Sequence, residues 1–494
     1  MDRNLLTYWQ YGVDTEAFRR LLKELNVKHC TYLYEHDYDV IYSDNMTPIN
    51  IFSGLSFFKN ANIKYEIDEK IMMRIAPFER TAMDVINRWH RSYLNKDDYA
   101  SVEELYLVFL RFWYDFIIKN NINLLIITIM PHIPMEYIPY IICKCLDIPT
   151  IIQGLLPLTD GEKTTYILQP EADEFDANLL NRYHYAQAEF LDSKTLDNIP
   201  LNIEIKRYFN QYSEQAKNDK RVIYYNQKNS IADIYRTYSN RIKLYISRND
   251  YKVLLKKIWY LFKVRIGTFS FLKKVTKLEE HPNLDADYYI FALHLQPEAT
   301  TLPAGGIFRN QLLAIRIISK LLPSNCFLYV KEHPSYWIQK GRLESVYESR
   351  TLSFYNEIKS LRNVKLIDHS IPSTVLIDNC KAVVTVTGTI GFEALFRGKP
   401  VLSFGETFYS KYPMVYRIRT IEDCENAINE IKNGCYSFNS LELAKYLYAI
   451  QKYAIPMGMN EKEYTDNGIP KVNDEDRDRI VDKIIEFCEE YYKG

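Results

Sequence analysis

The stretch AVVTVTGTIGFEALFRGKPVLSFG, residues 382–405, decides the fold class. It begins with a short apolar run at 382–386, which predicts a buried strand. The small polar turn TGT at 387–389 follows, and then a helical pattern leads to a second apolar strand at 400–404. A strand, a turn, a helix and a strand in this order form a βαβ unit, so the sequence predicts a parallel α/β sheet here.

The turn at 387–389 is suited to an anion. It offers two threonine hydroxyls and backbone N–H groups at the start of a helix, where phosphate groups bind readily. An ordinary helix start capped by threonine has the same pattern. The turn alone is therefore only a candidate phosphate site.

Two earlier strands strengthen this hypothesis. The apolar run at 289–295 ends in Gln-Pro-Glu at 296–298, and the run FLYVK at 327–331 ends in Lys-Glu-His-Pro at 331–334. The carboxyl ends of parallel strands meet at one edge of the sheet, where open α/β sheets bind ligands. Three successive strands that deliver polar side chains to one edge predict a nucleotide site.

Here the chain resembles a known family. The segments QPE, KEHP and TGTIGFEALFRGKPVLSFG are similar to those of the capsule polysaccharide biosynthesis proteins, over residues 289–409, while the first half of the chain is only weakly similar. Those proteins are bacterial glycosyltransferases of GT-B architecture, many of which transfer Kdo from CMP-Kdo. The His-Pro pair is also similar to that of bacterial sialyltransferases, which use CMP-sialic acid. The resemblance implies a nucleotide-sugar donor, with a CMP-linked sugar favoured, and a glycan or lipid-linked glycan acceptor.

The chain departs from the family at two points. Many members have Asn-Ser-Thr or Ser-Ser where this chain has TGT at 387–389, and the Kdo enzymes often have an aspartate where Glu298 stands. A hydroxyl group and a carboxylate are retained at the two positions. Binding of phosphate is therefore still expected, whereas the transferred sugar is left open.

The resemblance also implies roles for single residues. GT-B enzymes usually stabilise the leaving phosphate without a metal, through positive side chains and helix N-termini, so no metal and no cofactor is expected. Glu298 and His333 are the predicted catalytic residues, Glu298 as the nucleophile of a retaining enzyme or as the general base of an inverting one. The predicted donor-binding residues are Gln296, Lys331, Pro334, Thr387, Gly388, Thr389 and Glu393.

Each of these assignments has a structural alternative. Lys331 would then be an exposed strand end, Glu298 a capping residue in a loop, and Glu393 a carboxylate placed favourably near a helix N-terminus. The pattern Asp285-Ala286-Asp287 resembles a metal-binding motif, but it precedes a strand and so lies at the opposite edge of the sheet. We interpret it as a turn.

Composition limits the class of protein. A chain of 494 residues with 47% hydrophobic and 25% charged residues predicts two or three globular domains. A net charge of −1 argues against general nucleic-acid binding, which requires a basic excess. The eight cysteines show no zinc-binding spacing and are expected to be reduced, as in a cytoplasmic protein.

The predicted architecture is α/β and GT-B-like, with two Rossmann-like domains. We expect an acceptor-side domain at 1–198, a helical insertion at 199–286, a nucleotide-sugar domain at 287–440, and C-terminal helices at 441–494 that pack back across the domains. The first domain has its own βαβ pattern within 124–152, and its strand is followed by His132 and Glu136. These two residues are acceptor-side candidates, although a histidine satisfied by local backbone would leave the same pattern.

The segment 251–277 combines lysine, arginine and aromatic residues and contains no acidic residue. Such a segment favours contact with an anionic membrane surface, but a helix packed between domains with a basic outer face is equally compatible. No secretory signal or membrane-spanning stretch is predicted, because the first 20 residues are polar and the most apolar region, 124–156, is interrupted by four prolines. The expected location is cytoplasmic, peripheral at the inner membrane.

The function predicted from these observations is a glycosyltransferase of surface polysaccharide biosynthesis. A teichoic-acid-type polyol-phosphate transferase is the enzymatic alternative, because such enzymes also carry a His-Pro pair and a Ser-rich turn before a helix. A GT-B module without activity, acting within an assembly complex, is the non-enzymatic alternative. The choice between retention and inversion stays open.

Overall fold

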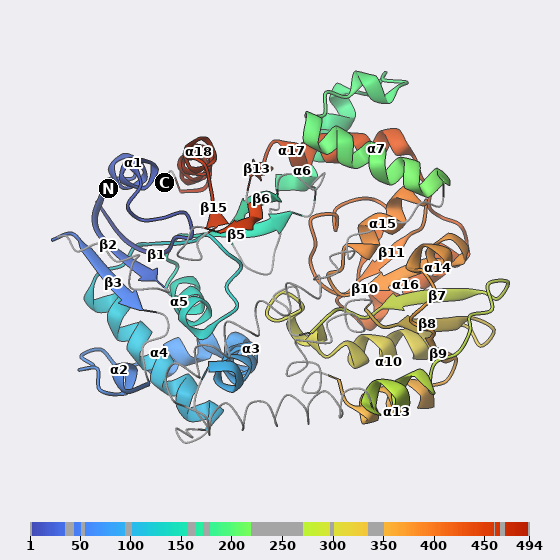
Figure 1. Cartoon of the computed structure of the whole chain (residues 1–494), viewed down its shortest axis with the longest axis horizontal. Helices are drawn as coiled ribbons and strands as arrows, with labels where there is room; N and C mark the ends of the chain where they lie inside the picture. Colours follow the sequence, from blue (N-terminus) through green and yellow to red (C-terminus); the bar gives the residue numbers. More distant parts are fainter. Residues whose placement is uncertain are drawn as a thin grey trace, which may run out of the picture.

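Two α/β halves lie side by side in the computed structural model, and both chain ends lie in the first of them (Figure 1). The structure describes residues 2–34, 44–50, 55–93, 101–156, 158, 164–170, 178–218, 270–296, 301–333, 350–458, 460–464 and 470–492. Each half is built on its own sheet, one of seven and one of six strands. This arrangement confirms the predicted α/β class with two Rossmann-like halves.

The first sheet has the order β13-β6-β5-β4-β1-β2-β3. Its strands are β1 (Arg3–Tyr8), β2 (Val27–Tyr34), β3 (Met46–Asn50), β4 (Leu124–Ile127), β5 (Thr150–Leu156), β6 (Thr164–Gln169) and β13 (Ile455–Met457). β1 to β5 are parallel, and β6 is antiparallel to both β5 and β13. Because the strand order reverses between β1 and β4, a ligand-binding crevice is expected at their carboxyl ends.

Helices cover both faces of this sheet. Leu5 of β1 packs in a core with α1 (Glu16–Glu24) and α18 (Asp474–Tyr491). Its neighbour Leu6 packs in a separate core on the other face, to which α3 (Glu69–Tyr93), α4 (Val102–Lys119) and α5 (Pro134–Cys145) contribute most of the side chains. The short helix α2 (Leu55–Lys59) contacts α4. Successive residues of a strand point to opposite faces, so a strand covered on both sides is mostly apolar. β4 (LLII) is apolar at every position, whereas β1 (RNLLTY) has its apolar pair Leu5 and Leu6 at the centre and a buried threonine, Thr7, beside them.

The second sheet is parallel throughout and has the order β12-β11-β10-β7-β8-β9. Its strands are β7 (Tyr288–Ala292), β8 (Phe327–Lys331), β9 (Val364–Ile367), β10 (Ala382–Thr385), β11 (Val401–Ser403) and β12 (Val415–Arg417). Between and after them run η3 (Gly306–Arg309), α10 (Gln311–Leu321), α13 (Leu352–Ser360), α14 (Ser373–Asn379), α15 (Ile390–Phe396) and α16 (Ile421–Lys432). The order reverses between β7 and β10, which places the switch point of this sheet at their carboxyl ends.

The C-terminal region returns from the second half to the first. α17 (Ser440–Gln451) packs against α6 (Asn178–Glu189) and contacts η2 (Leu196–Asn198) and α7 (Ile203–Asn218), and α18 packs against α1. The hairpin of β14 (Asn460–Tyr464) and β15 (Pro470–Lys471) lies between them in the chain. A terminal helix that crosses back to the first half is the GT-B arrangement. The domain limits stay predictions, because residues 219–269 lie outside the described part.

The basic segment 251–277 is described only from residue 270 onward. Residues 270–276 are helical, with Phe271 and Val275 buried in the core of the second half and Lys273 and Lys274 exposed. Phe271 is therefore not available for membrane contact, whereas the lysines are. Across the described residues, no helix has the length and apolar character needed to cross a membrane.

Candidate functional site

His294, which follows β7, contacts the turn that follows β10 at the switch point of the second sheet. Its Nε2 atom lies 3.2 Å from Thr385 Oγ1 and 3.2 Å from the backbone nitrogens of both Val386 and Thr387. These two N–H groups donate to Nε2, so the imidazole is neutral and carries its proton on Nδ1. Burial lowers the pKa of His294 to about 3, and the nearby His333 and Arg350 act in the same direction. His294 therefore fixes the turn and supplies no charge.

The turn itself is internally bonded. The backbone N–H of Gly388 donates to Thr385 Oγ1 at 3.0 Å, and the Tyr409 hydroxyl donates to the Gly388 carbonyl. A Cβ atom at Gly388 would lie 2.8 Å from Thr385 Oγ1 and 3.1 Å from His294 Cε1, so the close approach requires glycine. The predicted cradle of free N–H groups differs from this arrangement, because those of residues 386–388 are already bonded. Thr389 is exposed, and its hydroxyl does not cap α15.

Glu393 lies one turn into α15 and is half-buried. Burial raises the pKa of Glu393 to about 7, although the charge of Arg397 opposes this. Within the described part of the chain, no side chain or backbone group forms a hydrogen bond with this carboxylate. A carboxylate in this position is suited to accept hydrogen bonds from ribose hydroxyls.

Arg350 joins the end of β8 to the loop after β7. Its guanidinium donates to Glu332 Oε2 at 3.1 Å, to Gln296 Oε1 at 2.6 Å and to the His294 carbonyl at 2.8 Å, and the residue is only 2% exposed. Gln296 in turn donates to the Arg309 carbonyl at 2.8 Å. The predicted donor residue Gln296 is thus held in place by Arg350, which the sequence did not reveal.

His333 follows the buried Glu332 at the end of β8 and is itself half-buried. Its backbone N–H donates to Glu332 Oε1 at 2.8 Å, while Tyr355 donates to Glu332 Oε2 at 2.6 Å. Burial lowers the pKa of His333, and the charge of Glu332 only partly opposes this. We therefore expect His333 to be neutral at neutral pH, so it can exchange a proton or a hydrogen bond but does not supply a lasting positive charge. Pro334 lies outside the described residues.

Lys331 is neither an exposed strand end nor directed at the turn. It is 2% exposed, and its Nζ donates to the His369 carbonyl, 2.9 Å away in the loop after β9. Burial lowers the pKa of Lys331 to about 8, opposed by the charges of Glu279, Glu332 and Asp368. The structure thus differs from the predicted donor contact, because the ammonium group is turned toward β9.

Arg88 of α3 connects the two halves close to the predicted catalytic loop. Its guanidinium donates to the Leu302 carbonyl at 3.1 Å and also to the His132 carbonyl. Asp84, one turn earlier on α3, forms an ion pair with Arg309. Glu298 lies outside the described residues, but both contacts hold the chain just after it against the first half. Arg88 therefore links the backbone at His132, which follows β4 in the first sheet, to the backbone at Leu302.

Of the two acceptor-side candidates, only His132 is accessible. Glu136 is buried, and its Oε2 accepts from the backbone N–H of His132 at 2.9 Å and of Ile133 at 3.4 Å, so it caps the start of α5. His132 Nδ1 lies 3.2 Å from the same oxygen, and 33% of the side chain is exposed. Burial alone lowers the pKa of His132, but the hydrogen bond and charge of Glu136 raise it above its ordinary value.

A cavity of about 560 Å³ opens between the halves, beside Gln296. α3 contributes Arg80 and Asp84, and the second half contributes Arg309, Arg316 and Arg350 among others. Four arginines line the cavity, and each is paired with a carboxylate: Arg80 and Arg309 with Asp84, Arg316 with Glu357, and Arg350 with Glu332.

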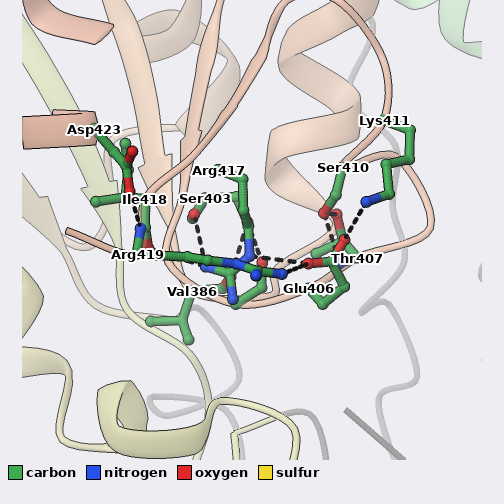
Figure 2. A network of polar contacts seen from close by, with 11 residues as sticks. Val386, Ser403, Glu406, Thr407, Ser410, Lys411, Arg417, Ile418, Arg419 and Asp423 are labelled. Carbon is green, nitrogen blue, oxygen red and sulfur yellow. Dashed lines mark hydrogen bonds and ion pairs between the residues drawn. The ribbon is translucent and has the colours of Figure 1, made fainter. Parts of the chain in front are cut away.

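A second cationic group surrounds Glu406 in the loop after β11 (Figure 2). Glu406 Oε2 accepts from Arg417 Nε at 3.0 Å, and its carboxylate oxygens lie 4.0 Å from Lys411 Nζ and 3.9 Å from Arg419 Nη2. The preceding Gly405 packs so closely on Thr387 that an added Cβ would collide with the threonine methyl. Three cations and one carboxylate thus give this edge of the TGT turn a positive charge. Sequence reasoning missed them, because their spacing matches no motif.

Residues 300–422 match the model of the family described as capsule polysaccharide biosynthesis protein. This range includes the KEHP segment and the TGT turn, and it confirms the resemblance over that part of the chain. No curated protein matches the chain.

The chain also matches solved structures, at low sequence identity and with low TM-scores. The beta Kdo 2,7 transferase of Thermosulfurimonas dismutans KpsC has 12% identity and a TM-score of 0.30, covering 82% of this chain and 95% of that one. The beta Kdo 2,4 transferase of the same KpsC has 14% identity and a TM-score of 0.28, covering 74% and 87%. The UDP-GlcNAc 2-epimerase of Methanocaldococcus jannaschii has 13% identity and a TM-score of 0.24, covering 99% and 100%. TM-scores and identities this low carry no information about the activity of this chain.

Proposed function

We propose that the chain is a GT-B glycosyltransferase of surface polysaccharide biosynthesis, which transfers a sugar from a nucleotide donor to a glycan acceptor. The observation that carries this proposal is the contact of His294 with residues 385–387 at the switch point of the second sheet. This is where open α/β sheets bind nucleotides. The turn lies in the segment that matches the capsule polysaccharide family, and the loop after β7 is held against the first half.

The donor binds along the carboxyl edge of the second sheet. Glu393 accepts hydrogen bonds from the ribose, and the Thr389 hydroxyl contacts the phosphate. Lys411 and Arg419 raise the local positive potential, which attracts an anionic donor. A CMP-linked sugar, such as CMP-Kdo, is the donor favoured by the family resemblance.

The chemistry needs one carboxylate and one neutral imidazole. The bond between the anomeric carbon and the phosphate oxygen breaks, and the acceptor oxygen takes its place at that carbon. If configuration is inverted, Glu298 is the general base that takes the proton of the acceptor hydroxyl. If it is retained, Glu298 attacks the anomeric carbon as the phosphate leaves, and the acceptor oxygen then displaces Glu298 while its proton passes to the released phosphate. His333 donates a hydrogen bond to the leaving phosphate in both cases. This route does not require a metal ion.

The acceptor enters from the first half. Support comes from Arg88, which binds the backbone carbonyls of both His132 and Leu302, and from the arginine-lined cavity beside Gln296, where a glycan or lipid-linked glycan would bind. The lysines of 251–277 would bring the enzyme to an anionic membrane surface that carries such an acceptor.

Product analysis tests the proposal. The full chain is incubated with an oligosaccharide acceptor and, separately, with CMP-, UDP-, GDP- and dTDP-sugars and CDP-glycerol. We expect release of a nucleotide and a phosphorus-free glycosidic linkage. A phosphodiester in the product would instead identify a polyol-phosphate transferase. Failure to bind any nucleotide would favour the module without activity.

A further inference from the structure

Two carboxylates and two imidazoles gather at the carboxyl end of β9. Ligand atoms of Glu279, Asp368 and His369 all lie within 4.8 Å of one another. His281 Nε2 lies 3.9 Å from Asp368 Oδ2 and is the nearby fourth group. None of the four belongs to the donor or acceptor site proposed above.

The backbone holds the two contributing segments together. Glu280 pairs with Ile367 as a parallel bridge. Its N–H donates to the Leu366 carbonyl at 2.8 Å, and its carbonyl accepts from the Asp368 N–H at 3.1 Å. In such extended pairing, residues 279 and 281 project to the same side of the bridge. The bridge therefore places residues 279 and 281 on one side, next to the loop after β9 that carries Asp368 and His369.

One oxygen of this cluster lacks a partner. The Glu279 side chain is only 5% exposed; its Oε2 lies 2.8 Å from His369 Nδ1, while its Oε1 is buried without any hydrogen bond in the described structure. The Lys331 ammonium group is close enough for its charge to act on Glu279, but its Nζ donates to the His369 carbonyl, and it forms no ion pair or hydrogen bond with Glu279 among the described residues. Burying an unpaired carboxylate oxygen raises the free energy of the folded state, and a cation bound to this oxygen would remove that free-energy cost.

We propose that Glu279, Asp368 and His369 bind one divalent transition-metal ion, with His281 as the fourth ligand. Two carboxylate oxygens and two imidazole nitrogens suit Zn²⁺, whereas Mg²⁺ and Ca²⁺ prefer oxygen ligands alone. Around a tetrahedral Zn²⁺ the ligand atoms are about 3.3 Å apart, so the three clustered groups, now within 4.8 Å of one another, and His281 would move closer on binding. The ion ties the 279–281 segment to the loop after β9, and through the His369 carbonyl it supports Lys331. It has no part in the glycosyl transfer.

The site escaped the sequence analysis for a physical reason. Its ligands come from two short segments at 279–281 and 368–369, which only the β9 bridge brings together. Neither segment has the spacing of a zinc motif.

Calorimetric titration with ZnSO₄ tests the site. The full-length chain, carrying Cys435→Ser to remove an exposed thiol, is first freed of metal with EDTA and returned to buffer. We expect saturable binding of one equivalent and a higher melting temperature with Zn²⁺. Glu279→Gln and His369→Gln should abolish binding, and His281→Gln should weaken it at least about tenfold. His184→Gln, at an exposed histidine on α6, is the matched control and should bind like the parent.

His281→Gln keeps the test decisive if a core variant fails to fold, because His281 is 83% exposed. Absence of saturable Zn²⁺ binding, or unchanged binding in a folded His281→Gln and Glu279→Gln, would overturn the proposal. Tighter binding of Mg²⁺ or Ca²⁺ than of Zn²⁺ would overturn the choice of metal. The result does not depend on the proposed transferase activity, since binding and melting are measured without substrate.

Discussion

The Nε2 atom of His294 lies 3.2 Å from the backbone nitrogen of Thr387, although 93 positions separate the two residues. A neutral imidazole that accepts two backbone N–H groups sets the start of a turn, and here the turn lies at the switch point of a parallel sheet. The position of the proposed donor site therefore depends on His294, a histidine that takes no part in the proposed reaction. The residues expected to take part in the reaction are Glu298, which follows β7 in the sequence, and His333, which follows β8.

Replacing His333 with alanine should abolish transfer and leave the fold intact. The residue is half-buried at the end of β8. In the proposed mechanism it contacts the leaving phosphate, and losing one such contact costs about 10²–10³ in rate. Initial rates and the far-UV spectrum measure the two effects. His184→Ala serves as control, and turnover near that of the parent in His333→Ala would remove this residue from the mechanism.

Glu298→Gln should be inactive and still bind the nucleotide. The substitution keeps the shape of the side chain and removes the charge needed for a nucleophile or a base. Activity and nucleotide affinity are measured on the same preparation. Joint loss of both would make Glu298 a binding residue and would contradict its catalytic assignment.

Glu393 should make the stability of the chain depend on pH. Its pKa is raised from 4.5 to about 7 by burial, so between these values the unfolded chain has lost the proton that the folded chain keeps. Stability therefore falls as pH rises through this range and stays low above it. The stability of Glu393→Gln relative to the parent should increase from pH 4.5 to pH 8 by on the order of 1–3 kcal/mol.

Urea unfolding at the two pH values measures this difference. Glu425→Gln, at an exposed position of α16, controls for the loss of one carboxylate. An equal effect of Glu393→Gln at both pH values would show that its carboxylate is not held in a destabilising environment.

The protein should sediment with anionic but not with neutral liposomes. Each Lys or Arg near an anionic surface contributes about 1 kcal/mol, and this contribution is screened by salt. Replacing Lys256, Lys257, Lys273 and Lys274 with glutamate should abolish the binding, whereas the same change at the exposed Lys23, Lys70, Lys119 and Lys194 should not. If the parent chain does not sediment with anionic liposomes at low salt, the segment 251–277 does not bind membranes and has only a packing role.

Local patterns were sufficient to predict much of the architecture. The runs at 327–331 and 382–386 are predicted as strands from their short apolar stretches, and they form β8 (Phe327–Lys331) and β10 (Ala382–Thr385), because a parallel strand covered on both faces is mostly apolar. The spacing of His132 and Glu136 singled out both residues as neighbours. In the structure Glu136 accepts a hydrogen bond from the His132 N–H, since a carboxylate in the first turn of a helix reaches back to the residues before it.

What could not be predicted depends on contacts between distant segments. His294 stands at the end of an apolar run and looks like part of the strand until β10 is placed beside β7. Lys331 looks exposed at the end of its strand, and its burial becomes visible only with the loop after β9, 38 positions away. Arg350 lies in no motif, yet it joins Gln296, Glu332 and His294.

Calorimetric binding of CMP, CDP, UDP, GDP and dTDP to the parent chain and to His294→Ala tests the central claim most directly. The claim is that a nucleotide binds at the switch point of the second sheet. We expect one equivalent of nucleotide to bind the parent, with CMP or CDP the tightest. In His294→Ala the N–H groups of Val386 and Thr387 lose their acceptor, at a cost of about 1–3 kcal/mol each, and the turn is released. Binding should then fall at least about tenfold while the variant stays folded, as a free energy of 1.4 kcal/mol corresponds to a factor of ten. Absence of nucleotide binding by the parent, or equal affinity in a folded His294→Ala, would contradict the account.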